Sequence, residues 1–488
     1  MSRPLLLGVD EGTSAVKAVL YDTDLRPVAE ARRDKPLTHP RPGWVEQDPE
    51  HVLVAVVDAV AEVLREADGD VVACGLDHQG ESVLAWEAGE AEPLTPIVTW
   101  QDKRSQEALD WLESGGGAEL VRERSGLPLD PYFSAGKLAW LLEHAPAVAR
   151  ARDAGTLRMG TVDSWLCDVL GAGFATDPST ASRTQLSAPG APDWDSELLA
   201  AFGVPREALP PIRDSVGELG TLRHPDWGRE LPLRAQVVDQ QAALAGAGCV
   251  EAGQVKATYG TGVFVLAHAG DVLPDPSAAG LLPTVAWRVD GRVEYALDGG
   301  VFTAGALLEW LSRDLGLAPD PAGLAELAGQ VKDSGGVRVL PALAGLGAPW
   351  WKPGASGVVA GLTAGTRPGH VGRAALEAIA WRVADILAAV AEQAPVASLR
   401  VDGGLTRDPL LLQLQADATG VPVERGMVDA TAAGAAALAA VGSGTWASIA
   451  EIGARIPAGD RIEAVRDDAW RAVAHADWRA FVQRAISL

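Results

Sequence analysis

Apolar residues occur in short continuous runs that are bounded by turn residues. The first run covers residues 5–9 and is followed by Asp10, a Gly12-Thr13 turn and a second run at residues 15–20. Runs of this length between turn residues are typical of buried strands. The pattern therefore predicts a β-hairpin near the N-terminus, with a carboxylate at the end of its first strand.

A second hairpin of the same kind is predicted near the middle of the chain. Residues 255–259 and 263–266 flank a Gly-Thr-Gly turn at residues 260–262. Glycine lets the backbone approach a ligand closely, and adjacent N–H groups beside a hydroxyl form a concave anion site. Most Gly-Thr turns in hairpins bind nothing. Because the device recurs, we interpret the two turns as a clamp that holds a polyphosphate from both sides. Asp10 fits this interpretation, since a buried carboxylate needs a partner such as a metal ion.

Strand and helix patterns alternate over the rest of the chain. Asp48 and Pro49 predict the start of a helix, in which valines recur at helical spacing from residue 52 to residue 63. Residues 71–76 predict a buried strand that ends in a polar run, and ligands collect at such strand ends in α/β sheets. Further strands are predicted near residues 233–238 and 399–402, and helices at 242–245, 409–418 and 430–441. We therefore expect an α/β fold.

The length of the chain predicts two domains. At 488 residues, the chain exceeds the size at which a single hydrophobic core stops growing. We place the boundary between residues 246 and 251, which gives domains of residues 1–247 and 248–488 with one hairpin each. The Pro- and Gly-rich stretch at residues 187–211 is expected to be a surface connection.

Charge and cysteine content narrow the classes of partner. The formal net charge of −24 argues against nucleic acid and against an anionic membrane surface. The three cysteines form no Cys-x-x-Cys pair, so they predict neither a zinc site nor a disulfide framework. The most apolar helical stretch, residues 52–64, is too short to span a bilayer, and no signal-peptide pattern precedes the first strand. We expect a cytoplasmic protein in which Lys17, backbone N–H groups and Mg²⁺ compensate the charge of an anionic substrate.

Several motifs together resemble the FGGY family of carbohydrate kinases, and within it the glycerol kinases. The motifs are residues 10–13 (DEGT), 97–102 (IVTWQD), 126–134 (GLPLDPYFS) and 258–262 (TYGTG), with the family's signature segments at 132–144 and 357–377. The resemblance implies the two-domain, ribonuclease H-like fold of actin, hexokinase and Hsp70, with a cleft between the domains. It also implies transfer of the γ-phosphate of ATP to a primary hydroxyl of a small polyol, with glycerol as the first candidate. The resemblance further implies a homodimer or a homotetramer and leaves open which.

The resemblance assigns roles to individual residues. It implies that Asp239 is the general base, which takes the proton of the attacking hydroxyl. From the residues alone, Asp239 fits a helix N-cap equally well, because Gln-Gln-Ala-Ala follows it. Mg²⁺ is implied at Asp10, in part through water, and at Asp239. The implied acceptor-binding residues are Glu81, Trp100, Tyr132, Asp239, Gln240 and Phe264. The implied nucleotide-binding residues are Gly12, Thr13, Ser14, Lys17, Thr261, Gly262, Gly305, Glu309, Gly403, Gly404 and Asp408.

Five positions depart from the pattern of glycerol kinases. Gly80 stands where an arginine is expected to bind two acceptor hydroxyls, so a longer acceptor such as erythritol or threitol is a second candidate. Lys17 replaces an arginine, which keeps the attraction to phosphate but loses bidentate geometry. Glu309 and Asp408 replace amides, which leaves the nucleotide preference open although ATP is expected. Glu230 replaces an arginine that binds fructose 1,6-bisphosphate in regulated enzymes, so we expect no such inhibition.

Two other functions stay open on the same fold. One is a kinase for a ketopentose or another sugar, although the segments around Trp100 and Tyr132 follow the pattern of glycerol kinases. The other is an actin- or Hsp70-like ATPase, or a sugar sensor without activity. A pure nucleotide switch would need neither Asp239 nor a polyol site.

Overall fold

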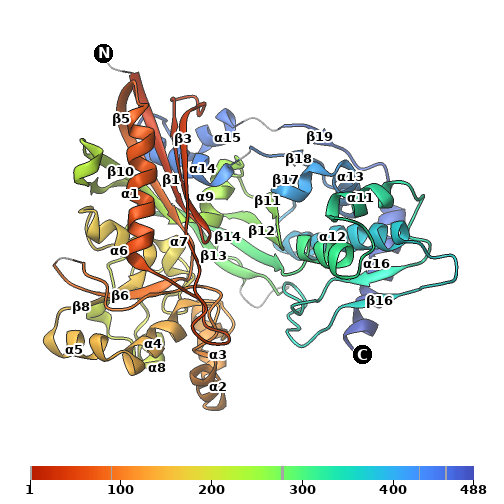
Figure 1. The fold of residues 1–488 in the computed structure, drawn as a ribbon, viewed down its shortest axis with the longest axis horizontal. Helices are drawn as coiled ribbons and strands as arrows, with labels where there is room; N and C mark the ends of the chain where they lie inside the picture. The colour runs from red at the N-terminus through yellow and green to blue at the C-terminus, as the bar shows by residue number, and fades with distance from the viewer. Residues whose placement is uncertain (1–2, 90, 276–279, 428, 457–458, 488) are drawn as a thin grey trace.

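The computed structural model describes residues 3–89, 91–275, 280–427, 429–456 and 459–487. A mixed sheet of thirteen strands runs through the molecule, in the order β19-β18-β17-β11-β12-β14-β13-β9-β10-β5-β1-β2-β3, with helices on both faces (Figure 1). The first half of the chain contributes β1 (Arg3–Glu11), β2 (Ala15–Tyr21), β3 (Pro27–Asp34), β5 (Gly69–His78), β9 (Val216–Leu222) and β10 (Leu231–Val238). The second half contributes β11 (Gln254–Tyr259), β12 (Val263–Gly270), β13 (Leu282–Val289), β14 (Arg292–Val301), β17 (Ser398–Asp402), β18 (Val423–Arg425) and β19 (Arg461–Ile462).

Both predicted hairpins are present and occupy equivalent places in the two halves. In the first, β1 pairs antiparallel with β2 and parallel with β5. In the second, β11 pairs antiparallel with β12 and parallel with β17. The strand predicted at residues 71–76 extends further than expected, because β5 continues to His78 and keeps Asp77 inside the sheet.

Each face of the first-half sheet is covered by a different helix. Side chains alternate along β1, so Leu5 and Leu7 pack with α1 (Pro49–Arg65), whereas Leu6 packs on the opposite face. The helix α1 begins as predicted, since the Asp48 side chain accepts a hydrogen bond from the backbone N–H of Glu50. The opposite face is covered by α9 (Asp239–Gly246) and α14 (Ala430–Gly442).

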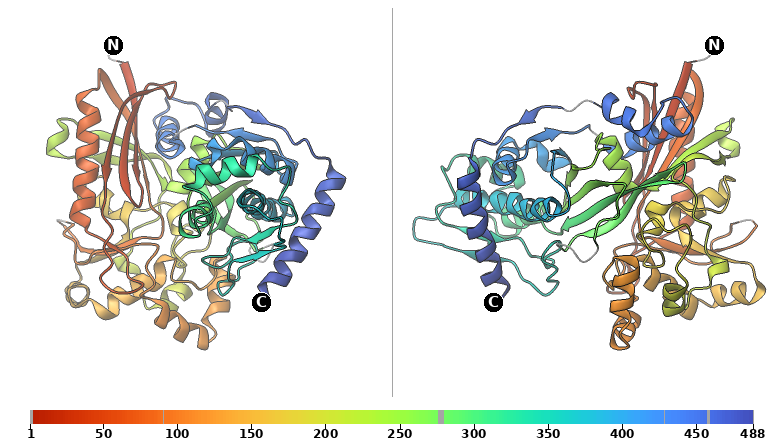
Figure 2. Two further views of the ribbon diagram at one scale, coloured as in Figure 1. Left: turned by 45° about the vertical axis from the view of Figure 1, so that its right-hand side comes forward. Right: turned by 180° about the vertical axis from the view of Figure 1, so that it is seen from behind.

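The helix α14 belongs to the second half of the chain but packs on strands of the first half (Figures 1 and 2). Glycines allow its backbone to approach very closely. A Cβ atom added to Gly8 of β1 would overlap the carbonyl group of Ala432, and one added to Gly75 of β5 would overlap that of Ala435. Within the sheet itself, β9 of the first half pairs with β13 of the second half, with Val216 opposite Val289.

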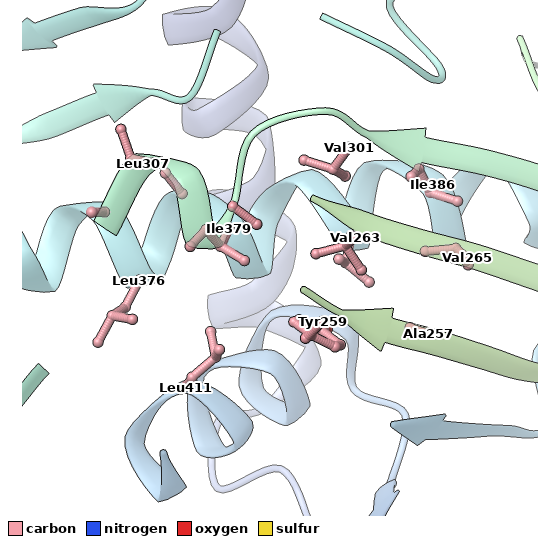
Figure 3. Packing of buried hydrophobic residues seen from close by; sticks show 14 of the residues in the cluster. Ala257, Tyr259, Val263, Val265, Val301, Leu307, Leu376, Ile379, Ile386 and Leu411 are labelled. Carbon is pink, nitrogen blue, oxygen red and sulfur yellow. The ribbon is translucent and has the colours of Figure 1, made fainter. Parts of the chain in front are cut away.

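The second half has its own core around α12 (Pro368–Ala391). Figure 3 shows Val263 and Val265 of β12 facing Ile379 and Ile386 of this helix. The remaining helices are α2 (Gln106–Ser114), α3 (Gly117–Ser125), α4 (Ser134–His144), α5 (Pro146–Ala154), α6 (Val162–Val169), α7 (Pro178–Ala181), α8 (Ser196–Phe202), α10 (Gly305–Glu309), α11 (Pro321–Gly329), α13 (Pro409–Thr419), α15 (Ile449–Arg455) and α16 (Asp468–Ile486). Two smaller sheets contain β4 (Glu46–Gln47), β6 (Val83–Glu87), β7 (Ile97–Val98) and β8 (Leu157–Thr161), and β15 (Arg338–Leu340) and β16 (Val358–Ala360).

The expectation that residues 187–211 form only a surface connection is wrong. They contain α8, which Asp195 caps, and Trp194, Leu198 and Phe202 are buried in a core with α4 and α5. The three apolar residues recur at helical spacing, but the prolines and glycines on either side of this short helix concealed the pattern.

In the part of the chain that the structure describes, no helix combines the length and apolarity that crossing a membrane requires.

Candidate active site

A cavity of about 220 Å³ lies where the two halves of the chain meet. The first half contributes the residues after β5 and the start of α9, and the second half contributes side chains of β12, β13 and β14. All six predicted acceptor-binding residues line it: Glu81, Trp100, Tyr132, Asp239, Gln240 and Phe264. Thr13 of the first hairpin turn lines it as well. The structure therefore brings the predicted acceptor residues together beside one of the predicted phosphate-binding turns.

Asp239 enters this cavity from the junction of β10 and α9. It is the first residue of the helix, and Val238 occupies the N-cap position. The alternative interpretation of Asp239 as a helix N-cap is therefore wrong. Burial, together with the negative charges of Asp10 and Glu81, raises the pKa of Asp239 to about 7, while Lys256 opposes the shift.

This raised pKa predicts how turnover depends on pH. Below its pKa the carboxyl group of Asp239 is protonated and accepts no further proton, so kcat/KM for the acceptor should fall as the pH is lowered from 8 to 5. A bound cation stabilises the carboxylate, so the acid limb should lie at or below about pH 7. The measurement is kcat/KM between pH 5 and 9 at fixed Mg·ATP. A value that stays constant or rises toward pH 5 would contradict the assignment.

Asp10 lies opposite a second carboxylate that sequence analysis left without a role. The register of β1 and β5 pairs Asp10 with Asp77, which is completely buried. Burial, then the charges of Asp10 and Asp239, raise the pKa of Asp77 well above its ordinary range, and burial also raises the pKa of Asp10. The carboxyl groups of Asp10 and Asp77 lie within hydrogen-bonding reach of each other, and Asp77 has no other hydrogen-bond partner among the described residues. Oxygen donors of this kind suit Mg²⁺.

The described residues do not form a complete metal site by themselves. Among them, no three carboxylate, imidazole or thiol side chains are arranged to hold a metal ion. Mg²⁺ commonly takes one or two carboxylates and completes its shell with water and substrate phosphates. Asp10 and Asp239 would supply such a partial set.

Two side chains donate hydrogen bonds to Thr13 in the first hairpin turn. The indole N–H of Trp100 donates to Oγ1 of Thr13 over 2.8 Å, and the side-chain amide of Gln47 donates to the Thr13 carbonyl over 2.6 Å. Gly12 lies against Asp10, because a Cβ on this glycine would approach Asp10 Oδ1 to 3.3 Å. The turn predicted to bind phosphate and an aromatic residue predicted to bind the acceptor are therefore in direct contact.

The second hairpin turn is surrounded by predicted nucleotide-binding residues. The backbone N–H of Gly305 donates to the carbonyl of Gly260 over 3.0 Å. Gly403, at a φ of 94°, follows β17 and lies so close to the backbone of Tyr259 that a Cβ would overlap it. Gly262 is packed in the same way against the carbonyl of Val301. Around the second turn, these glycines therefore allow backbone segments to lie in close contact with one another.

Three charged residues predicted to face the nucleotide have partners within the chain. Lys17 Nζ lies 2.5 Å from Asp429 Oδ2, at the start of α14. Glu309 pairs with Arg313 one turn further along the chain, at 2.7 Å. Asp408 caps α13 by accepting a hydrogen bond from Leu410 N–H over 2.9 Å. A carboxylate at position 408 thus has a structural role, since aspartate is a favourable N-cap.

Sequence analysis missed several residues of the cavity. Arg183, Gln241, Thr284 and Asp298 line it, and Lys256 donates from Nζ to Gln240 Oε1 over 2.7 Å. No local motif marks these positions. The contact between Arg183 and Glu81 joins residues 102 positions apart, so the fold alone reveals it.

A two-domain α/β fold with a Gly-Thr hairpin in each half and a carboxylate-lined cavity between them defines a phosphotransferase of the sugar kinase type. The N-terminal and C-terminal domain models of the FGGY family of carbohydrate kinases match residues 5–246 and 255–443. The chain belongs to this family, and the resemblance seen in its motifs is confirmed.

Known proteins similar to the chain include curated glycerol kinases. That of Alkalilimnicola ehrlichii is 45 % identical over 443 residues, with 89 % of each chain covered. That of Dechloromonas aromatica is 42 % identical, with 99 % of this chain and 98 % of the relative covered.

Two solved structures illustrate the shared fold. The structure of Plasmodium falciparum glycerol kinase with ADP superposes with a TM-score of 0.94 at 27 % identity, covering 99 % of this chain and 98 % of that one. The xylulose kinase of Rhodospirillum rubrum superposes with a TM-score of 0.87 at 24 % identity over 98 % of both chains, which shows a common fold alone. The α/β fold expected from the sequence is confirmed.

Proposed function

We propose that the chain transfers the γ-phosphate of ATP to a primary hydroxyl of glycerol. The observation that carries this proposal is the cavity, in which the carboxylates of Glu81 and Asp239, the amide of Gln240 and three aromatic side chains converge beside the Thr13 turn. Carboxylates and amides bind hydroxyl groups, and aromatic faces cover the C–H edges of a polyol. The similarity to curated glycerol kinases over nearly the whole chain supports the same acceptor.

In the proposed reaction, Asp239 takes the proton of the acceptor hydroxyl. The hydroxyl oxygen forms a bond to the γ-phosphorus while the bond from this phosphorus to the β,γ-bridging oxygen breaks, and ADP leaves. Gln240, which accepts a hydrogen bond from Lys256 at Oε1, would orient the acceptor with its side-chain amide N–H group. Glu81 would accept a hydrogen bond from another hydroxyl. Catalysis then depends mainly on positioning and on compensation of charge.

We propose that Asp10 and Asp239 hold Mg²⁺, in part through water. When bound, the ion would neutralise charge on the β- and γ-phosphates. The nucleotide would lie between Gly12, Thr13 and Ser14 of the first turn and Thr261 and Gly262 of the second. We place the adenosine against Gly305, Gly403 and Gly404. A solved relative that binds ADP supports ATP as the donor.

The second candidate acceptor is a four-carbon polyol. Gly80 has no side chain in the cavity, and a Cβ there would approach Val238 Cγ1 to 3.0 Å. The tight contact means that a side chain at position 80 would displace its neighbour, whereas glycine leaves this part of the cavity wall without a side chain. Erythritol and threitol carry one more hydroxylated carbon than glycerol.

A panel of acceptors tests the proposal. ADP release with Mg·ATP should be fastest with glycerol and should be measured beside erythritol, D- and L-threitol, dihydroxyacetone and D-xylulose. EDTA should abolish it, because the phosphate charge is then uncompensated. If erythritol or threitol has the higher kcat/KM, the glycerol assignment is wrong and the four-carbon alternative holds. Turnover of similar rate without any acceptor would identify an ATPase instead.

A further inference from the structure

Arg183 is a buried arginine in the wall of the acceptor cavity. It follows α7, and 5 % of its surface is exposed. Among the described residues that line the cavity, Arg183 alone has a cationic side chain. Neither the resemblance nor the proposed reaction uses it.

Two of its three guanidinium nitrogens are anchored by carboxylates. Nε donates to Glu81 Oε1 over 2.7 Å, and Nη2 lies 2.9 Å from Asp298 Oδ2. The guanidinium carbon also lies 5.4 Å from the ring centre of Phe133. Glu81 belongs to the first half of the chain and Asp298 to β14 of the second, so the guanidinium plane is fixed between both walls of the cavity.

The third guanidinium nitrogen, Nη1, is not anchored in this way. Arg183 Nη1 is buried and has no hydrogen-bond partner among the described residues. Gln241 Oε1, on the same cavity, is likewise buried and without a partner among them. A buried donor without a partner is costly, and so is a buried acceptor. One free donor and one free acceptor are the complement of a hydroxyl group, which both accepts and donates.

Gly80, which has no side chain, lies next to a residue that anchors Arg183. It precedes Glu81, the anchor of Arg183, and lines the same cavity. Because no described residue accepts a hydrogen bond from Nη1, a hydroxyl of a molecule bound in the cavity is a candidate partner.

We propose that Arg183 is a substrate-binding residue that donates a charge-assisted hydrogen bond from Nη1 to an acceptor hydroxyl other than the one phosphorylated. The inference rests on the proposed function, because it names a residue that binds a hydroxyl group of the acceptor in that site. Arg183 thereby determines specificity for acceptors that carry a further hydroxyl.

The primary variant is Arg183→Lys, which keeps the charge between Glu81 and Asp298 but removes Nη1. A charge-assisted hydrogen bond to a substrate hydroxyl is worth about 10- to 100-fold in kcat/KM. The loss for glycerol should appear mainly in the KM of glycerol, with the KM of ATP changed less than about threefold. The matched control is Arg104→Lys, because Arg104 is also buried between two carboxylates, Glu46 and Asp102, but does not line the cavity.

Deoxy acceptors distinguish binding from a structural role. 1,3-Propanediol lacks the secondary hydroxyl of glycerol, and 1,2-propanediol lacks one primary hydroxyl. If Nη1 binds one of these groups, Arg183→Lys should cost glycerol about tenfold or more but should leave the diol that lacks this group changed less than about threefold. An inhibition constant replaces kcat/KM where a diol turns over too slowly. An equal loss on all three acceptors, or no loss on glycerol, would overturn the proposal.

A second variant tests the proposal independently in case Arg183→Lys folds poorly. Asp298→Asn keeps the shape of one anchor and weakens its hold, so it should raise the KM of glycerol by a smaller factor and spare the same diol. Addition of Gly80→Arg to Arg183→Lys should restore part of the glycerol affinity. Failure of both expectations refutes the inference.

The outcome for the wild-type protein separates this inference from the proposed function. If the wild-type protein phosphorylates no polyol, the proposed function itself fails. Normal wild-type turnover together with an unaffected Arg183→Lys variant refutes this inference alone.

Discussion

The variant Asp239→Asn should lose about 10²- to 10⁴-fold in kcat for phosphoryl transfer while it still binds nucleotide. Asparagine preserves the shape of the side chain, but its amide has no basic oxygen that could take the hydroxyl proton. The carboxylate is in place for this task because it starts α9 at the cavity wall and does not cap the helix.

Two measurements separate the role as base from a role as metal ligand. Calorimetry should give an ADP affinity within about threefold of the wild type. The substitution removes a negative charge near the phosphates, so it adds no repulsion that would weaken binding. Raising the Mg²⁺ concentration should not restore turnover. Recovery at high Mg²⁺ would show that Asp239 acts through the metal alone, and near-normal turnover would refute the assignment. The exposed Asp226→Asn is the control, and it should leave kcat unchanged.

The variant Gly434→Ala should destabilise the protein strongly, although alanine favours helix. Gly434 lies in α14 where this helix crosses α9, and a Cβ there would overlap the carbonyl oxygen of Ala242. The obstacle is backbone, which cannot rotate away, so the helices must separate. Overpacking of this kind costs about 1–3 kcal/mol and occasionally more, which outweighs the roughly 1 kcal/mol that alanine gains over glycine in a helix.

The same substitution at another glycine provides a matched control. Gly329 ends α11 and is exposed, and a Cβ added to it would meet no atom within 4 Å. Gly329→Ala should leave the urea midpoint unchanged or raise it slightly, whereas Gly434→Ala should lower it. Because α9 carries Asp239 at its start, Gly434→Ala should also reduce kcat. Equal midpoints for the two variants would refute this account of the helix crossing.

Local sequence patterns predicted the hairpins, α1 and α13, because each depends on neighbours within a few residues. They left the role of Asp239 open, and only the resemblance to the family assigned it. They did not predict the contacts of Arg183, whose anchors Glu81 and Asp298 lie more than 100 residues away on either side. They also missed the buried carboxylate of Asp77, which faces Asp10 only through the parallel pairing of two strands.

The placement of α14 shows another limit of sequence patterns. Residues 430–441 are mostly alanine, so they predict a helix without indicating which of its faces is buried. In the structure nearly the whole helix is buried, and its backbone is pressed against glycines of β1 and β5. Small residues on both sides make this packing possible, and their pairing becomes visible only in three dimensions.

The same helix imposes an order on folding during synthesis. When the first 247 residues have left the ribosome, the sheet face around Leu6, Gly8 and Gly75 still lacks α14, which is made almost 200 residues later. At about 5–20 residues per second, this interval lasts on the order of ten seconds or more, and the uncovered apolar face is a site for misassembly or chaperone capture. We expect a fragment cut at the boundary between the halves to lack α14 and so to leave that apolar face uncovered.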